Sequence, residues 1–123
     1  MSLKALNIDE VRALARRRLP RGMFEFIDRG AQDEMGLKAT RRALDDVKLL
    51  PKILVDVSER RQDTELLGAR QPSPLVVAPT GLAGLMWHQG EVELARAAAK
   101  AGVPFCVSTH SITSIEEIAK KAG

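Results

Sequence analysis

The chain has 123 residues, of which 45% are hydrophobic and 3% aromatic, and it contains no tyrosine. This length predicts one domain or part of a larger one, and the formal net charge of +3 is mild and spread along the chain. Few aromatic side chains are present for bases to stack on, so we expect no nucleic-acid partner. The densest basic group, Arg16, Arg17 and Arg18 with Arg21, is interpreted as the solvated end of a helix. A phosphate- or membrane-facing patch is the alternative.

A single cysteine, Cys106, excludes an internal disulfide and a metal site built from several cysteines. It falls inside a strand pattern, so we expect an inert thiol in the core. The first residues lack the long apolar core of a signal peptide, and no apolar run approaches the ~18 residues of a transmembrane segment. We therefore expect a cytoplasmic location.

The first expected helix begins with a capping box, in which Asn7 is the N-cap and Glu10 stands three residues later. Pro20 should end this helix, because proline disfavours a helical conformation in the residue before it. Its apolar residues recur with helical spacing and predict one buried face, made of Ile8, Val11, Leu14 and Ala15.

Two further helices are expected before residue 50. Apolar residues within 23–27 predict the second, which Gly30 can close in a left-handed conformation. The third is expected over residues 33–46. Asp33 and Glu34 would lie in its first turn, where carboxylates interact favourably with the helix dipole.

The helical period is lost over residues 49–74, where charged residues and prolines mark loops. Residues 64–67 are a candidate short strand before Gly68. We expect this stretch to be an extended connection that packs beneath a barrel. Residues 1–74 would then form an N-terminal part, and residues 75–123 the start of the barrel.

An apolar run over residues 75–79 stops at Pro79 and predicts a fully buried parallel strand. A second run over 104–109 follows at the length of a βαβ repeat. A crossover of this length implies parallel, right-handed pairing of the two strands. The predicted fold class is therefore α/β, a TIM (β/α)8 barrel, of which this chain holds the N-terminal helices and the first two βα units. Two strands alone leave unpaired edges, so further strands are expected downstream or on another chain.

The helix between these strands is expected over residues 91–101, with Gly102 as its C-cap. Its inner stripe is predicted to consist of Val92, Ala95, Ala98 and Ala99. Ser114 and Glu117 form a second capping box, which starts the last helix. Residues 81–88 are interpreted as a loop.

Small polar residues follow both predicted strands, where a barrel places its ligand site. The loop between Gly81 and Gly84 is a weak phosphate or flavin signal, and a flexible loop is an equal alternative. The hydroxyls of Ser108 and Thr109 can hydrogen-bond a cofactor, or only water. Nothing near His110 in the sequence orients it as a base. No metal-ligand spacing is present, so no metal is expected.

Five motifs, in order along the chain, resemble the FMN-dependent 2-hydroxy-acid oxidase and dehydrogenase family, whose branches include glycolate oxidase, lactate oxidase and mandelate dehydrogenase. They occupy residues 19–34, 50–58, 74–81, 90–102 and 108–119. The loop that begins Pro79-Thr80-Gly81-Leu82 and contains Trp87 is most similar to the mandelate dehydrogenase branch.

The resemblance implies an enzyme that uses FMN to oxidise an (S)-2-hydroxy acid to a 2-oxo acid. It implies that Pro79, Thr80 and Gly81 approach the flavin through backbone groups, with Gly81 near the reactive N5 edge. Ser108 would hydrogen-bond the isoalloxazine ring, and His110 would line the substrate pocket.

Phe26 stands where relatives usually have a tyrosine whose hydroxyl binds the substrate carboxylate. It is expected at the substrate, but it cannot donate that hydrogen bond. The family's catalytic histidine and carboxylate-binding arginines match no position here. No catalytic residue is therefore assigned, and residues 1–123 alone should be inactive.

The expected partners are a small 2-hydroxy acid and the rest of the barrel, in the same protein or on a second chain. The complete protein is expected to be a homo-oligomer. The alternative function is a non-catalytic one: a truncated fragment, or a docking module that needs a complementary chain.

Overall fold

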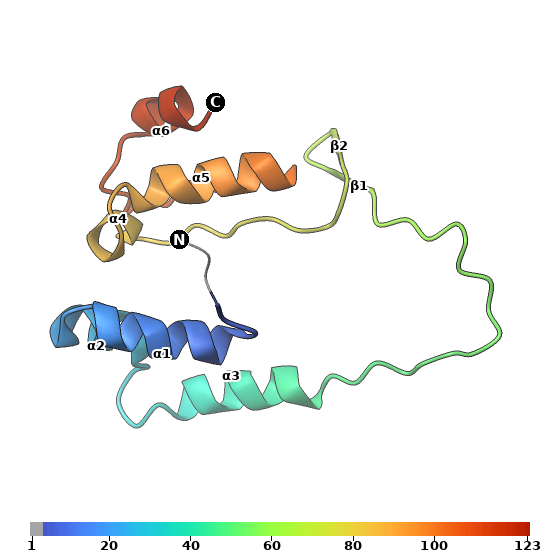
Figure 1. The fold of residues 1–123 in the computed structure, drawn as a ribbon, viewed down its shortest axis with the longest axis horizontal. Helices are drawn as coiled ribbons and strands as arrows, with labels where there is room; N and C mark the ends of the chain where they lie inside the picture. Colours follow the sequence, from blue (N-terminus) through green and yellow to red (C-terminus); the bar gives the residue numbers. More distant parts are fainter. Residues whose placement is uncertain (1–3) are drawn as a thin grey trace. The chain divides into compact units, whose positions relative to one another are not determined.

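The computed structural model describes residues 4–123, which divide into two compact units, one up to Val55 and one from Asp56 onward. Figure 1 shows the course of the chain, and each unit is described by itself. Residues 1–3 belong to the N-terminus interpreted above as lacking a signal peptide, and they lie outside the described residues. No helix within residues 4–123 is long and apolar enough to cross a membrane.

The first unit opens with α1 (Ile8–Arg18), and its predicted cap is confirmed. The side chain of Asn7 accepts a hydrogen bond from the amide of Glu10 at 2.9 Å. The Glu10 carboxylate accepts from the amide of Leu6, also at 2.9 Å, so the return bond reaches one residue beyond the cap. The helix ends before Pro20, as predicted. Its predicted apolar face is not buried within this unit: Ile8 is 79% exposed and Leu14 42%.

The second helix, α2 (Arg21–Asp28), packs against α1 and buries one aromatic ring, that of Phe24. Arg12 on α1 holds the Asp28 carboxylate with both Nε and Nη2, the latter at 2.9 Å. The predicted left-handed cap at Gly30 is wrong. Arg29 is the C-cap instead, in an extended conformation with φ −88°, so no glycine is needed there.

The third helix, α3 (Met35–Asp46), starts two residues later than predicted, and Asp33 and Glu34 are not in its first turn. Glu34 is the N-cap, in the left-handed region with φ 60°. The cause is a tight turn before the helix: the amide of Glu34 donates to the carbonyl of Ala31 at 2.9 Å, and its carboxylate accepts from the amide of Gly30 at 3.4 Å. Forming this turn takes both acidic residues out of the helix.

In the second unit, β1 (Thr64–Leu66) confirms the candidate strand. It pairs antiparallel with β2 (Ala69–Gln71), which the sequence did not reveal. The two-residue connection, Leu67 and Gly68, has positive φ at both positions, 51° and 76°. That is the geometry of a type I′ turn, whose twist matches that of paired strands.

The two predicted barrel strands meet as a short parallel bridge between Val77 and Phe105. The amide of Val77 donates to Pro104 O at 2.9 Å, and the amide of Cys106 donates to Val77 O at 3.0 Å. The parallel pairing is therefore confirmed. The expectation of a fully buried strand at 75–79 is wrong for the described residues: Leu75 is 66% exposed, because its segment has a strand partner on one side only.

Three helices complete this unit: α4 (Ala83–Met86), α5 (Gly90–Ala101) and α6 (Ile115–Ala122). The helix α4 lies where only a loop was expected. Gly102 caps α5 with φ 68°, and the Ser114 side chain caps α6 by accepting from the Glu117 amide at 3.2 Å, both as predicted. Figure 1 shows α5 and α6 side by side, and they contact each other.

The core of this unit lies between α5, α6 and the parallel bridge. Val92, Ala95 and Ile118 are its buried centre, with Phe105 and Val107 packed against it. Three of the four residues in the predicted stripe of α5 are buried, and Ala99 is exposed instead.

Cys106 is exposed, which corrects the expectation of a core thiol. Side chains alternate along an extended segment. Since Phe105 and Val107 face the helices, Cys106 lies on the opposite face, which no described element covers.

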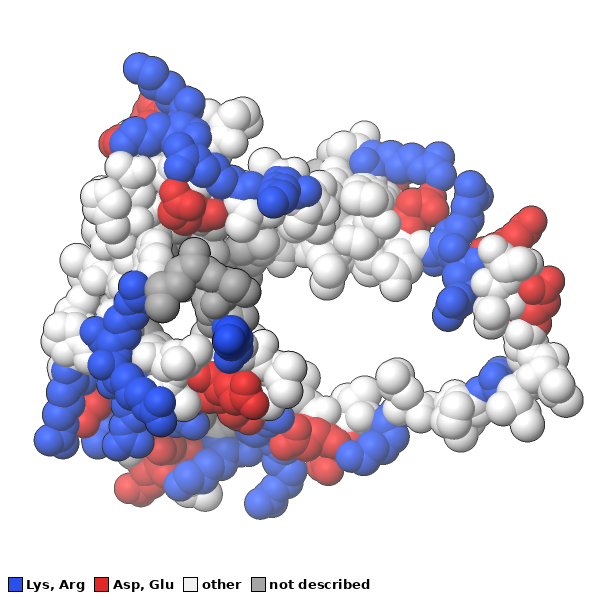
Figure 2. Space-filling model, in the orientation of Figure 1, with Lys and Arg blue, Asp and Glu red and all other residues white. Residues whose placement is uncertain are grey.

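Charged side chains of both signs are interspersed over the face drawn in Figure 2. Arg16, Arg17 and Arg18 form the exposed last turn of α1, where cations interact favourably with the helix dipole. This placement agrees with the interpretation of the group as a solvated helix end.

Candidate functional site

The ends of the two barrel strands lie together at one edge of the second unit. The amide of Leu82, just after the first strand, donates a hydrogen bond to the carbonyl of His110, just after the second, at 3.1 Å. The parallel bridge at Val77 and Phe105 sets this register. Four of the predicted site residues are thus brought to the same edge: Thr80, Gly81, Ser108 and His110.

Gly81 lies directly against the second strand end. A Cβ atom added at Gly81 would stand 3.1 Å from the Cβ of His110 and 3.5 Å from the Oγ of Ser108. Gly81 is outside the left-handed region, so space rather than backbone conformation favours glycine here. Any larger residue must displace His110 or Ser108.

The second strand end is ordered by its own side chains. Ser108 Oγ accepts from the amide of His110 at 3.1 Å, and Ser108 O accepts from the amide of Ser111 at 3.0 Å. Thr109 Oγ1 lies 3.3 Å from His110 Nδ1. Ser108 uses its oxygen as an acceptor, so its hydroxyl hydrogen can still be donated to a ligand.

Pro79 and Thr80 are exposed, and the Thr80 hydroxyl donates to the carbonyl of Ala78 at 3.4 Å. Within residues 4–123, no protein acceptor pairs with the backbone amide of Thr80 or of Gly81. Pro79 has no amide hydrogen to offer. The amides of Thr80 and Gly81 and the hydroxyl of Ser108 are therefore available as donors to a ligand at this edge.

Two non-glycine residues bracket α4 in the left-handed region, Leu82 with φ 57° and Gln89 with φ 53°. Such conformations cost on the order of 1–3 kcal/mol each and persist only where the surroundings hold them. The left-handed conformation of Leu82 directs its amide toward the carbonyl of His110, and this hydrogen bond holds Leu82 against the second strand end.

Sequence reasoning missed Glu91, whose side chain is 2% exposed behind this edge. It accepts from the amide of Ile112 at 3.4 Å and from the hydroxyl of Thr113 at 3.2 Å, both in the loop after the second strand, and it lies close to Gly84 in the segment after the first. An acidic residue in the first turn of a helix is ordinarily an exposed partner of the helix dipole, so the sequence held no signal of its burial.

Phe26 is not among these residues. It lies on α2, in the first unit, and is 65% exposed. Its side chain is therefore open to a ligand.

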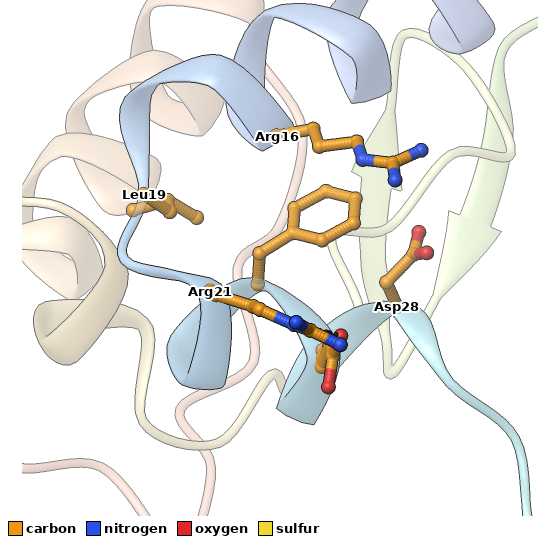
Figure 3. A pocket seen from close by; sticks show the side chains of 6 residues that line it. Arg16, Leu19, Arg21 and Asp28 are labelled. Atoms are coloured by element: carbon orange, nitrogen blue, oxygen red, sulfur yellow. Dashed lines mark hydrogen bonds and ion pairs between the residues drawn. The ribbon is translucent and has the colours of Figure 1, made fainter.

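The first unit also holds a cavity of about 500 Å³ between α1 and α2, lined by Arg16, Leu19, Arg21, Phe24, Glu25 and Asp28 (Figure 3). Figure 3 shows the Arg16 side chain extending toward Asp28. A hydrogen bond from Arg21 lowers the pKa of Glu25, and one from Arg12 lowers the pKa of Asp28. Because both carboxylates are already paired, we assign no ligand to this cavity.

No group of three or more His, Cys, Asp or Glu side chains is placed to hold a metal ion in the described part of the chain. The donors at the strand ends are amides and a hydroxyl. They suit the carbonyl oxygens and ring nitrogens of an organic ligand or an anion.

Comparison with known proteins decides the family. The family described as FMN-dependent dehydrogenase matches residues 15–123. The chain belongs to this family. The fold class predicted for it, the N-terminal helices and first two βα units of a TIM barrel, is confirmed by the likeness of this FMN-dependent dehydrogenase segment to solved members.

Among curated relatives, this family segment is 45% identical over 121 residues to the (S)-mandelate dehydrogenase of Pseudomonas putida, covering 98% of the chain and 31% of the relative. It is 42% identical over 116 residues to an L-lactate dehydrogenase of Pseudomonas syringae, covering 94% and 30%. The chain spans about a third of the length of these relatives.

A crystal structure of a soluble mutant of the membrane-associated (S)-mandelate dehydrogenase from Pseudomonas putida is also similar. Its TM-score is 0.87 at 45% identity, and the match covers 95% of this chain and 34% of that one.

Proposed function

We propose that the complete protein oxidises an (S)-2-hydroxy acid to a 2-oxo acid with FMN, and that residues 75–123 hold the N5 side of the flavin. The observation that carries this proposal is the meeting of Gly81 with Ser108 at one edge, beside amides that have no protein acceptor among residues 4–123. When bound, FMN supplies the acceptor for the hydride equivalent that leaves the substrate.

Each residue at the strand ends would make a different contact with FMN. The amides of Thr80 and Gly81 would donate to the N5 edge of the ring. Fixed donors there would stabilise the negative charge of the reduced flavin. Pro79 fixes the backbone that carries them, because its φ is locked. Ser108 donates its hydroxyl to the isoalloxazine ring.

His110 and Phe26 would form walls of the substrate pocket. His110 is exposed beside Gly81, close to where the N5 edge would lie. Phe26 presents an aromatic ring without a hydroxyl, which favours a substrate whose carboxylate is held by other groups. The substrates named for the relatives, mandelate and lactate, are the first candidates.

The group that takes the substrate's hydroxyl proton, and the cations that hold its carboxylate, would come from the remaining barrel units. We place the start of the barrel at residue 75, with residues 1–74 as the preceding N-terminal part. The support for this boundary is that Val77 is where the parallel pairing begins. The missing units would lie in the same protein or on a second chain, and the complete protein would form a homo-oligomer.

We propose a cytoplasmic location, in agreement with the single cysteine of the sequence. One similar protein is membrane-associated by its own description. Fractionation of cells into cytosol and membranes separates free protein from protein bound at the cytoplasmic face.

The proposed function is tested by purifying the complete protein and recording its visible spectrum. The expected result is bound FMN that bleaches when (S)-mandelate or L-lactate is added without oxygen. A protein that contains the whole barrel, remains colourless and binds no added FMN would exclude this function. It would favour the docking module, whose complementary chain should then co-purify.

A further inference from the structure

Glu91 begins α5 and is almost completely buried, with 2% of its surface exposed. Its Oε1 accepts from the amide of Ile112 at 3.4 Å, and its Oε2 accepts from the hydroxyl of Thr113 at 3.2 Å. The backbone amides of Gly84 and of Glu91 itself also act on the carboxylate by lowering its pKa. Both oxygens are therefore engaged by donors of the loop after the second strand, and Gly84, in the segment after the first strand, lies close to Oε2.

Glu91 is buried as a carboxylate. Burial alone raises the pKa of a carboxyl group, but the three backbone amides and the Thr113 hydroxyl lower it, and the net pKa lies below the ordinary value. No ion pair of Glu91 with Lys, Arg or His is present among residues 4–123. The negative charge is stabilised by the dipoles of backbone amides and of the Thr113 hydroxyl, which belong to the surrounding chain segments.

The loops pack around this carboxylate without spare room. A Cβ added at Gly84 would stand 2.7 Å from Glu91 Oε2 and 2.6 Å from the Cδ1 of Ile112. One added at Gly90 would stand 2.4 Å from the carbonyl oxygen of Ala83. Gly84 lies three residues after Gly81, and Ile112 lies two residues after His110, so the carboxylate joins the two segments that carry the candidate site.

We propose that Glu91 is a positioning residue, whose carboxylate fastens the loop after the first barrel strand to the loop after the second. It thereby sets the spacing between the Gly81 amide and the Ser108 hydroxyl for the edge of a flavin ring. The role toward FMN rests on the proposed function, and the fastening of the loops does not. Glu91 itself lies behind the edge and touches no reacting atom.

The test compares Glu91→Gln with Glu93→Gln in the complete protein. Glutamine keeps the size of the side chain but replaces one acceptor oxygen with a donor, so it cannot accept from all of the donors that now surround the carboxylate. Glu93 is on the same helix and pairs with Arg96 on the surface, so its variant controls for the loss of an acidic residue from α5. Glu91→Asp keeps the carboxylate on a shorter stem and should restore part of the wild-type behaviour.

Two readouts other than turnover report the result. Hydrogen exchange should be at least ~10-fold faster in Glu91→Gln for the amides of Gly84 and Ile112, because bonds to an ionised acceptor are the strong ones. It should be unchanged in the middle of α5. The dissociation constant for FMN should rise by about tenfold, with a change in the visible circular dichroism of bound FMN and no matching fall in Tm.

Each outcome decides the matter. Faster exchange in both loops with weaker FMN binding, in Glu91→Gln only, supports positioning. Exchange that accelerates throughout α5 with a fall in Tm shows a purely structural carboxylate and overturns it. Unchanged exchange, or unchanged FMN binding, also overturns it while the proposed function stands. If the wild-type complete protein binds no FMN, the proposed function itself has failed, and the positioning role fails with it.

Gly84→Ala provides a second route if Glu91→Gln does not fold. It leaves the carboxylate in place but pushes it away from the first loop, since the added methyl overlaps Oε2. Weaker FMN binding with faster exchange at Ile112 is expected. Wild-type values for both measurements would overturn the proposal.

Discussion

The amide of Leu82 donates a hydrogen bond across 3.1 Å to the carbonyl oxygen of His110. This bond joins two strand ends that are far apart in the sequence, and it is made by a residue in the left-handed region. It brings Gly81 against His110 and Ser108. The candidate site therefore depends on the backbone as much as on side chains.

Replacing Gly81 should weaken FMN binding in proportion to the size of the new side chain. The methyl of Gly81→Ala meets His110 Cβ at 3.1 Å, so small movements accommodate it, whereas Gly81→Val brings two further carbons into the same space. Overpacking of this kind typically costs about 1–3 kcal/mol, so we expect a roughly 5- to 150-fold higher dissociation constant for the valine variant. Fluorescence titration of the complete protein with FMN measures it. Gly36→Ala, where an added Cβ meets nothing within 4 Å, should bind FMN as the wild type does.

Phe26→Tyr should lower the KM for small 2-hydroxy acids, because it adds the hydroxyl that the family resemblance leads us to expect at the substrate carboxylate. A modest net hydrogen bond corresponds to a decrease of up to ~10-fold. Steady-state kinetics with mandelate and lactate measure the effect. Ile27→Tyr, at the neighbouring half-exposed position, controls for an added phenol. A KM that stays the same or rises in Phe26→Tyr would show that the pocket is built around an apolar contact.

The pairing of α1 with α2 should weaken in acid through Asp28. A hydrogen bond from Arg12, with the attraction of its charge, places the pKa of Asp28 below the ordinary 3.8. A lowered folded-state pKa gives stability that is present above about pH 4 and is lost as the pH falls through the folded value. In native-state hydrogen exchange, the opening free energy of α1 and α2 should decrease below pH 4 in the wild type and vary less in Asp28→Asn. Asp45→Asn, whose partner Arg41 lies in the same helix, should follow the wild type. Equal pH profiles for Asp28→Asn and wild type would refute the link.

Residues 1–123 by themselves should not unfold cooperatively or bind FMN. Leu50 and Ile53 are each 85% exposed and Leu75 is 66% exposed, while the buried core of the second unit centres on only three side chains. The net free energy of unfolding of a domain is only ~5–15 kcal/mol, so losing most of the barrel contacts should remove nearly all of it. Thermal scans and near-UV circular dichroism of 1–123 are the measurements, with the complete protein as the control. A soluble monomer with one sharp transition would instead indicate an independent module.

The features predicted correctly from the sequence are those set by neighbours within a few residues or by a repeat. The cap at Asn7, the cap at Ser114 and the left-handed Gly102 each follow from local chemistry. The parallel pairing of the two barrel strands follows from the length of the crossover between them. The same rule predicts that Gly81 and Ser108, which follow the two strands, lie at one edge.

The errors occurred where two signals competed or where burial depended on distant partners. Asp33 and Glu34 are residue types that favour the first turn of a helix. Both instead lie in the tight turn before α3, which is closed by the hydrogen bond from the Glu34 amide to the Ala31 carbonyl. The four-residue helix α4 is too short to show a period. The exposure of Cys106 and the burial of Glu91 depend on which elements cover them, and a single sequence does not carry that information.

The parallel pairing of Val77 with Phe105 also sets an order of events while the chain is being synthesised. The antiparallel hairpin of β1 and β2 can close within microseconds of leaving the ribosome, because its halves are adjacent. Val77 must wait for roughly 30 more residues, which takes seconds at ~5–20 residues per second. During each round of translation the apolar segment around Leu75 is thus an unpaired edge for that time. A chaperone that recognises nascent β-edges would find its target there, and not at the hairpin.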